Sequence, residues 1–150
     1  MKKAIGIFKA ANIILILTGI LHLVGHFQEQ VPANDKENTL LDLMKNYYFN
    51  FGGMERSMRD IVNALSLSLS LFTFFIALLN LMLLHQLVNQ QVLKKIMLIN
   101  IVFWGVLEII LIRYTIPPPI ICYGLAWLCL LVSYLVLSKQ TQSESSSKNL

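Results

Sequence analysis

The stretch LSLSLSLFTFFIALLNLMLL, residues 65–84, decides the fold, because its start alternates like a β-strand although it lies in an apolar block long enough for a membrane helix. Its first eight residues alternate leucine with serine as far as Phe72, as a half-buried β-strand does. The stretch nevertheless lies within a long apolar block, Met58–Leu84. In a bilayer, an open strand edge leaves backbone N–H and C=O groups without partners, so a helix is the viable structure. We therefore predict one membrane-spanning helix for the whole block.

The composition also indicates that a bilayer is the solvent of this chain. Of its 150 residues, 56% are hydrophobic and 13% are charged, whereas roughly a quarter of the residues in a soluble domain are charged. Four apolar blocks approach the ~20 residues needed to cross the hydrocarbon core: about 4–27, 58–84, 96–114 and 120–137. We predict an all-α fold, an integral membrane four-helix bundle in a single domain, residues 1–138. A disordered polar tail follows it, residues 139–150.

Basic residues at the block edges predict the orientation of the bundle. The side that holds both termini carries seven lysines: Lys2, Lys3, Lys9, Lys94, Lys95, Lys139 and Lys148. The opposite side also carries six acidic residues, and its basic residues number five: Lys36, Lys45, Arg56, Arg59 and Arg113. We expect a multi-pass protein of the cell (inner) membrane with both termini in the cytoplasm. The net charge of +4 forms no patch, so we expect membrane lipids rather than nucleic acid as partners.

An alternative is that Met1–Ala33 is a cleavable signal peptide, with a basic start, an apolar middle and VPA before Asn34. The apolar run is long for such a peptide, and the segment after it is polar and extended. We therefore favour a retained first span.

The long outer loop, residues 28–57, contains a helix signal. Asn34 followed by Glu37 resembles a capping box, and a partly apolar face comes after it. Four aromatic residues then suit the headgroup level of a membrane: Tyr47, Tyr48, Phe49 and Phe51. We predict a short interfacial helix, broken by Gly52-Gly53.

Polar residues inside the spans follow helical spacing, which predicts that they face the bundle interior. In the first span Thr18, His22, His26 and Glu29 share one face, and Ser70 and Glu108 lie on such faces of the second and third spans. At 1.5 Å per residue, His22 and Glu108 both lie about 20 Å from the inner surface. We therefore predict that His22 pairs with Glu108. The candidate residues of an outward-facing polar cavity are His22, His26, Asp60, Ser70 and Glu108.

The two histidines allow three further interpretations: a metal site, a haem site and a purely structural role. His22 and His26, at i and i+4, are weak candidates for a metal site with a glutamate as third ligand, and we predict no metal. Haem is disfavoured because both histidines lie on one helix and the other spans carry no histidine in the outer half. The plainest alternative is that the polar stripes only hold the helices together by interhelical hydrogen bonds.

Several charged residues fall at the outer boundary of the bundle. The segment GGMERSMRDI, residues 52–61, places Arg56, Arg59 and Asp60 at the start of a span, where Arg56 and Asp60 could pair. Two arginines there could bind an anionic headgroup or a carboxylate ligand. The predicted entrance or headgroup contacts are Glu29, Arg56, Arg59 and Arg113.

The stretches TGILHLVGHF, residues 18–27, and GGMERSMRDI, with four spans around them, resemble small DoxX-like four-helix bacterial membrane proteins. The resemblance covers roughly residues 10–137 and assigns no functional residue. It implies a link to quinol oxidase or thiol-redox systems, although this chain has no Cys-x-x-Cys motif.

From these patterns we expect a ligand-binding or complex-supporting membrane protein rather than an enzyme. It would bind a lipid-like or quinone-like ligand through the polar cavity, or support a membrane complex as a homo-oligomer or with a membrane-protein partner. The alternatives are a membrane enzyme that uses His22 and Glu108 as acid and base, and a small proton-coupled transporter. We predict no cofactor.

Overall fold

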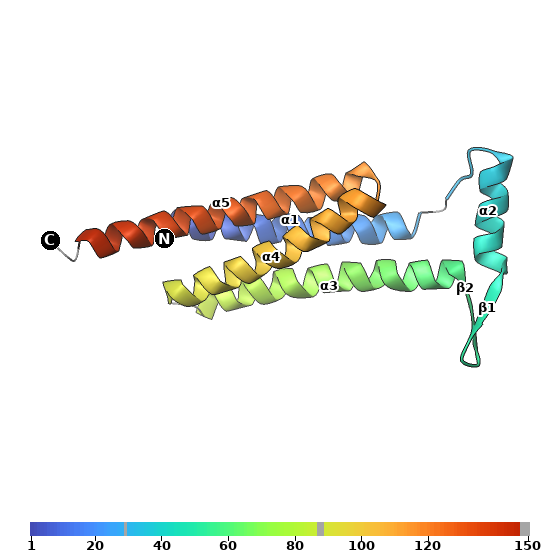
Figure 1. Ribbon diagram of the computed structural model, residues 1–150, viewed down its shortest axis with the longest axis horizontal. Helices are drawn as coiled ribbons and strands as arrows, with labels where there is room; N and C mark the ends of the chain where they lie inside the picture. The colour runs from blue at the N-terminus through green and yellow to red at the C-terminus, as the bar shows by residue number, and fades with distance from the viewer. Residues whose placement is uncertain (29, 87–88, 148–150) are drawn as a thin grey trace. The chain divides into compact units, whose positions relative to one another are not determined.

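The computed structural model describes residues 1–28, 30–86 and 89–147 (Figure 1). Within these ranges the chain forms five helices: α1 (Lys2–His26), α2 (Asp35–Asn46), α3 (Met58–Gln86), α4 (Gln90–Tyr114) and α5 (Pro117–Ser147). One antiparallel hairpin, β1 (Tyr48–Phe51) and β2 (Met54–Ser57), lies between α2 and α3. The predominantly helical architecture is thus confirmed.

Four of these helices are long and apolar enough to cross a membrane: Lys2–His26, Met58–Leu84, Gln90–Tyr114 and Pro117–Gln140. Each of them contains or closely overlaps one of the four predicted blocks. The leucine–serine alternation lies wholly inside α3, so the helical interpretation of that stretch is confirmed.

Two predicted boundaries differ from the structure. Helix α4 begins at Gln90 rather than near Ile96, because the Asn89 side chain caps it by accepting a hydrogen bond from the Gln91 N–H at 2.8 Å. Helix α5 continues through Ser147, whereas we predicted disorder from residue 139. No glycine or proline interrupts residues 138–147, so the backbone hydrogen bonds of the span continue into the polar segment.

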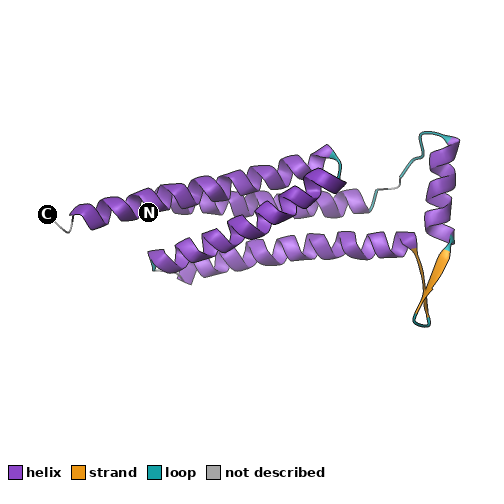
Figure 2. Cartoon of the chain, viewed as in Figure 1, coloured by secondary structure: helices purple, strands orange, loops and turns teal. Residues whose placement is uncertain are grey.

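The segment between α1 and α3 has a helix at the predicted place and a hairpin that we did not predict (Figure 2). Asn34 Oδ1 accepts from the Glu37 N–H at 3.0 Å, and the Glu37 carboxylate accepts from the Ala33 N–H at 2.6 Å. These reciprocal bonds start α2, as the capping pattern predicted. Gly52 and Gly53 do not break the helix as we predicted, because α2 already ends at Asn46. Their φ angles of 58° and 89° form the tight turn of the hairpin.

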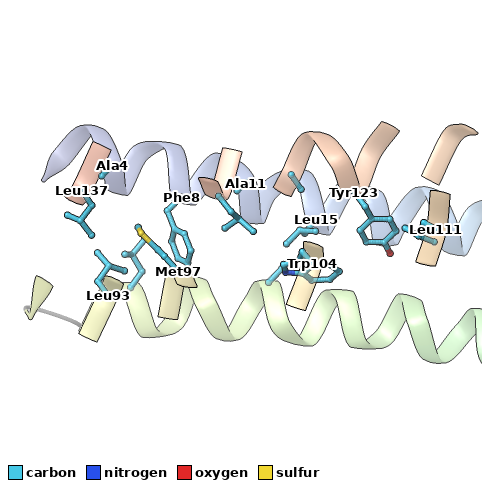
Figure 3. Packing of buried hydrophobic residues seen from close by; sticks show 14 residues of the cluster. Ala4, Phe8, Ala11, Leu15, Leu93, Met97, Trp104, Leu111, Tyr123 and Leu137 are labelled. Carbon is cyan, nitrogen blue, oxygen red and sulfur yellow. The ribbon is translucent and has the colours of Figure 1, made fainter. Parts of the chain in front are cut away.

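The chain divides into two compact units: a first unit of Met1–Thr18 with Thr73–Leu150, and a second unit of Gly19–Phe72. The apolar core belongs to the first unit (Figure 3). Its residues recur at spacings of three, four and seven, the heptad-like pattern of side chains that interlock between packed helices: Ala4, Phe8, Ala11 and Leu15 of α1, Leu93, Met97, Trp104 and Leu111 of α4, and Tyr123, Ala126, Leu130 and Leu137 of α5. This packing fixes the rotation of each helix, and so decides which polar side chains face inward.

Candidate functional site

A group of buried amides joins three helices of the first unit. Asn80 of α3 donates to the Oδ1 atoms of Asn12 on α1 and Asn100 on α4, both at 2.8 Å. Asn100 donates back to Asn80 Oδ1 at 3.1 Å and to the Ile96 carbonyl, while its own Oδ1 also accepts from Trp104 Nε1 at 3.3 Å. Asn12 donates to the Phe8 carbonyl at 2.8 Å. Each amide N–H of Asn80 and Asn100 has an acceptor within the protein. The network therefore has the properties of interhelical hydrogen bonding that stabilises helix packing, rather than of a ligand site.

Other buried polar groups of the first unit are also paired. Thr73 Oγ1 and the Tyr123 hydroxyl lie 2.9 Å apart, and the Tyr123 ring stacks on Trp104 with a centroid distance of 5.5 Å. Ser133 of α5 donates to the Ala4 carbonyl of α1 at 2.8 Å. These bonds connect helices through their packed faces. They fit the alternative interpretation of the polar stripes, in which those residues only hold the helices together.

Glu108 is the exception to this pairing. Its Oε2 atom is shielded from solvent, and among the residues that the structure describes it is the one buried side-chain nitrogen or oxygen without a hydrogen-bond partner. Its Oε1 atom lies 3.0 Å from the position that a Cβ atom on Gly124 of α5 would occupy. The absence of a side chain at Gly124 is therefore what makes room for the carboxylate between α4 and α5.

A second glycine contact, at Gly105, lies between the same two helices. The indole Nε1 of Trp127 lies 2.9 Å from the position of a Cβ atom on Gly105 and donates to the Ile101 carbonyl at 2.9 Å. Each helix thus places a large side chain over a glycine of the other. Close packing at small residues of this kind is typical of membrane helix pairs.

An apolar groove of about 610 Å³ follows another face of α4. Its walls are exclusively aliphatic and aromatic: Leu98, Ile99, Val102, Phe103, Val106, Leu107 and Ile110. Leu107 precedes Glu108 and so lies about 100° around the helix from it. One turn of α4 therefore carries a buried hydrogen-bond acceptor and an exposed apolar face.

In the second unit, the half-buried His22 of α1 is tied to α3. Its Nε2 atom lies 3.0 Å from Ser66 Oγ, and Ser70, which is buried, donates to the Ser66 carbonyl at 3.2 Å. Which of His22 and Ser66 donates depends on the histidine tautomer. Glu108 belongs to the first unit, and its predicted pairing with His22 stays a prediction, as does a cavity that draws on both residues.

The remaining predicted site residues lie apart from these contacts. His26 is the last residue of α1 and meets Phe27 edge to face, with ring centroids 5.2 Å apart. Asp60 is exposed and caps α3. Its Oδ2 accepts from the Ser57 N–H at 2.9 Å, and Ser57 Oγ accepts from the Asp60 N–H at 3.1 Å. Asp60 therefore has a structural task that its spacing from Arg56 did not indicate.

The predicted outer charges divide between two kinds of structure. Arg56 lies in β2, where it faces Phe49, so the helical spacing that we assigned to Arg56 and Asp60 does not apply. Arg59 follows in the first turn of α3, and Arg113 is exposed in the last turn of α4. Glu29 lies outside the described residues.

The described part of the chain contains no group of side chains that could complete a metal site at His22 and His26. Within residues 1–28, 30–86 and 89–147, no three histidine, cysteine, aspartate or glutamate side chains group closely enough to hold an ion. The i and i+4 spacing of His22 and His26 therefore gains no third ligand there.

Sequence reasoning missed Asn12, Gly105 and Gly124. Asn12 had a usable signal, because it is a polar residue in the apolar run of the first span, three residues before the buried Leu15. The two glycines had only the general preference of membrane helix contacts for small residues. Their contacts with Glu108 and Trp127 depend on helix rotation, which spacing alone does not provide.

Comparison of the chain with protein-family models, with curated proteins and with solved structures found no match.

Proposed function

We propose that this protein is a multi-pass membrane protein whose helical bundle binds a small amphipathic ligand, with Glu108 accepting a hydrogen bond from the ligand's polar end. The orientation that agrees best with the lysine distribution has both termini in the cytoplasm of a bacterial cell. We also propose that the chain is related to the DoxX-like membrane proteins that it resembles. A lipid-like or quinol-like molecule with a hydroxyl group has the required chemistry.

The observation that carries this proposal is the buried, unpartnered Oε2 atom of Glu108. A buried polar atom without a hydrogen bond costs about 1–3 kcal/mol, and a carboxyl group inside a membrane span is costly even when it is well placed. Every asparagine of the neighbouring network avoids that cost through bonds within the protein. A hydroxyl group on a ligand would offset the cost at Glu108.

The apolar groove on α4 supports the amphipathic character of the ligand. Its aliphatic and aromatic walls offer nothing to a polar molecule, while they suit an acyl or isoprenoid chain. We place the outer segment, α2 and the hairpin, at the outer membrane interface, as the aromatic residues there suggest.

Native mass spectrometry of the detergent-purified protein tests the proposal. We expect a small-molecule adduct on the wild type that is lost from Glu108→Leu and reduced in Gly124→Ala, because a methyl group at residue 124 would displace the carboxylate. Gly6→Ala is the matched control, since nothing lies within 4 Å of that position. An unliganded wild type, or equal adduct occupancy in Glu108→Leu, would overturn the proposal.

A further inference from the structure

The hairpin between α2 and α3 has two chemically different faces. The register pairs Phe49 with Arg56 and Phe51 with Met54, so these four side chains project from one face. Asn50 pairs with Glu55, and Tyr48 with Ser57, on the other face. Neither the pairing nor the two faces could be read from a helical interpretation of this segment.

The apolar face carries a continuous row of aromatic rings. The ring centroids of Tyr47 and Phe49 lie 4.9 Å apart, and those of Phe49 and Phe51 lie 5.8 Å apart. Phe51 is 53% exposed and Met54 is 59% exposed, so this row is covered incompletely by the described residues of the chain. A two-stranded hairpin is marginally stable in water, and this one presents its most apolar surface outward.

The connection to α3 limits where the hairpin can lie. Strand β2 ends at Ser57, and α3, one of the four membrane-length helices, begins at Met58 with no linker. The Ser57–Asp60 capping bonds fix this junction. If α3 crosses a bilayer, the hairpin is held within a few residues of the headgroups, because a strand rises about 3.3 Å per residue.

We infer that the hairpin is a membrane-surface anchor, whose Phe49–Phe51–Met54 face enters the boundary between lipid headgroups and acyl chains. Arg56 projects from the same face nearer to α3, where its Nη1 atom donates to the Glu55 carbonyl at 2.7 Å. At the membrane surface its guanidinium would lie within reach of a lipid phosphate while its stem stays among apolar groups. Glu55 and Asn50 remain in water on the opposite face. The inference rests on the membrane insertion proposed above but not on the ligand site at Glu108.

Spin labels on adjacent residues test this assignment. In a background with both cysteines replaced, Cys122→Ser and Cys129→Ser, single labels are placed by Met54→Cys and Glu55→Cys. The proteins are reconstituted into vesicles of phosphatidylethanolamine and phosphatidylglycerol. Electron paramagnetic resonance then measures collisions with oxygen, which concentrates in lipid, and with a water-soluble nickel chelate. We expect an oxygen-to-nickel collision ratio severalfold higher at residue 54 than at residue 55.

Two results would overturn the inference. Frequent nickel collisions at both positions would place the whole hairpin in water, and exclusion of both reagents from residue 54 would show that protein, such as a second copy of the chain, covers that face. Leu71→Cys, on an exposed position within α3, separates this failure from failure of membrane insertion. A lipid-like label at residue 71 beside a water-like label at residue 54 defeats only the anchor, whereas a water-like label at residue 71 defeats insertion itself.

Discussion

The asparagine network and Glu108 are two polar features of the same unit, and they differ in how completely the protein satisfies them. Asn12, Asn80 and Asn100 form a closed set of hydrogen bonds across three helices. Glu108, two turns along α4 from Asn100, keeps a buried oxygen without a partner among the described residues. Both features include side-chain atoms that are buried in the interior of the unit. Hydrogen-bond completeness, rather than burial or position, is what separates a packing residue from a candidate binding residue here.

The largest effect is expected at the centre of the closed network. Asn80→Leu removes three hydrogen bonds, each worth about 0.6–1.7 kcal/mol between membrane helices, and leaves the amides of Asn12 and Asn100 without their partner. We expect the free energy of unfolding to fall by about 2–5 kcal/mol. Denaturant titration in detergent, followed by tryptophan fluorescence, measures the loss.

Ser68→Ala is the matched control for this change. Ser68 is an exposed residue of the same helix, so its replacement should leave the unfolding transition unchanged. Equal stability of Asn80→Leu and Ser68→Ala would show that the network contributes nothing.

The next effect concerns the two glycine contacts between α4 and α5. In Gly105→Ala, the new methyl group would meet the Trp127 indole, which is held by its bond to the Ile101 carbonyl. We expect a loss of about 1–3 kcal/mol from overpacking, measured by the same titration. Gly6→Ala meets open space and should be neutral or slightly stabilising because alanine favours helix. Indistinguishable results for the two variants would argue against a close α4–α5 contact.

Much of this architecture follows from local patterns in the sequence. The four long helices follow from the apolar blocks, and the start of α2 follows from Asn34 and Glu37, because both signals lie within a few neighbouring residues. The hairpin was missed although Gly52-Gly53 between aromatic and polar residues is a turn signal. The aromatic residues before the glycines also suit the headgroup level of a membrane, and that interpretation as an interfacial segment conceals the strand-like alternation of residues 48–57.

The candidate site could be predicted only in part, because its properties depend on contacts between helices. The four-residue spacing of Asn100, Trp104 and Glu108 puts them on one face of α4, and the structure buries Asn100, Trp104 and the Oε2 atom of Glu108. Spacing could not reveal that Gly124 makes room for one carboxylate, or that Asn12 completes the amide network. Those facts depend on the rotation and height of α5 and α1, which side-chain packing sets.

A smaller effect is expected for the histidine contact of the second unit. The His22–Ser66 hydrogen bond joins α1 to α3, and a single interhelical bond contributes about 0.6 kcal/mol on average. A double-mutant cycle with His22→Ala, Ser66→Ala and both changes should return a coupling energy near that value. A coupling energy of zero would remove His22 from the helix-joining residues and leave its polar ring without a structural role.

The smallest change in stability is expected at Glu108, and its sign gives the sharpest contrast with Asn80. Glu108→Met keeps a long side chain beside Gly124 but removes an oxygen that has no hydrogen bond to lose within the described chain. Removing a buried polar group that lacks a partner relieves its desolvation cost. We therefore expect an unfolding free energy that is unchanged or slightly raised in ligand-free protein, measured after exhaustive detergent exchange. A loss comparable to that of Asn80→Leu would mean that the carboxylate is bonded within the bundle, and Glu108 would then join the asparagines as a packing residue.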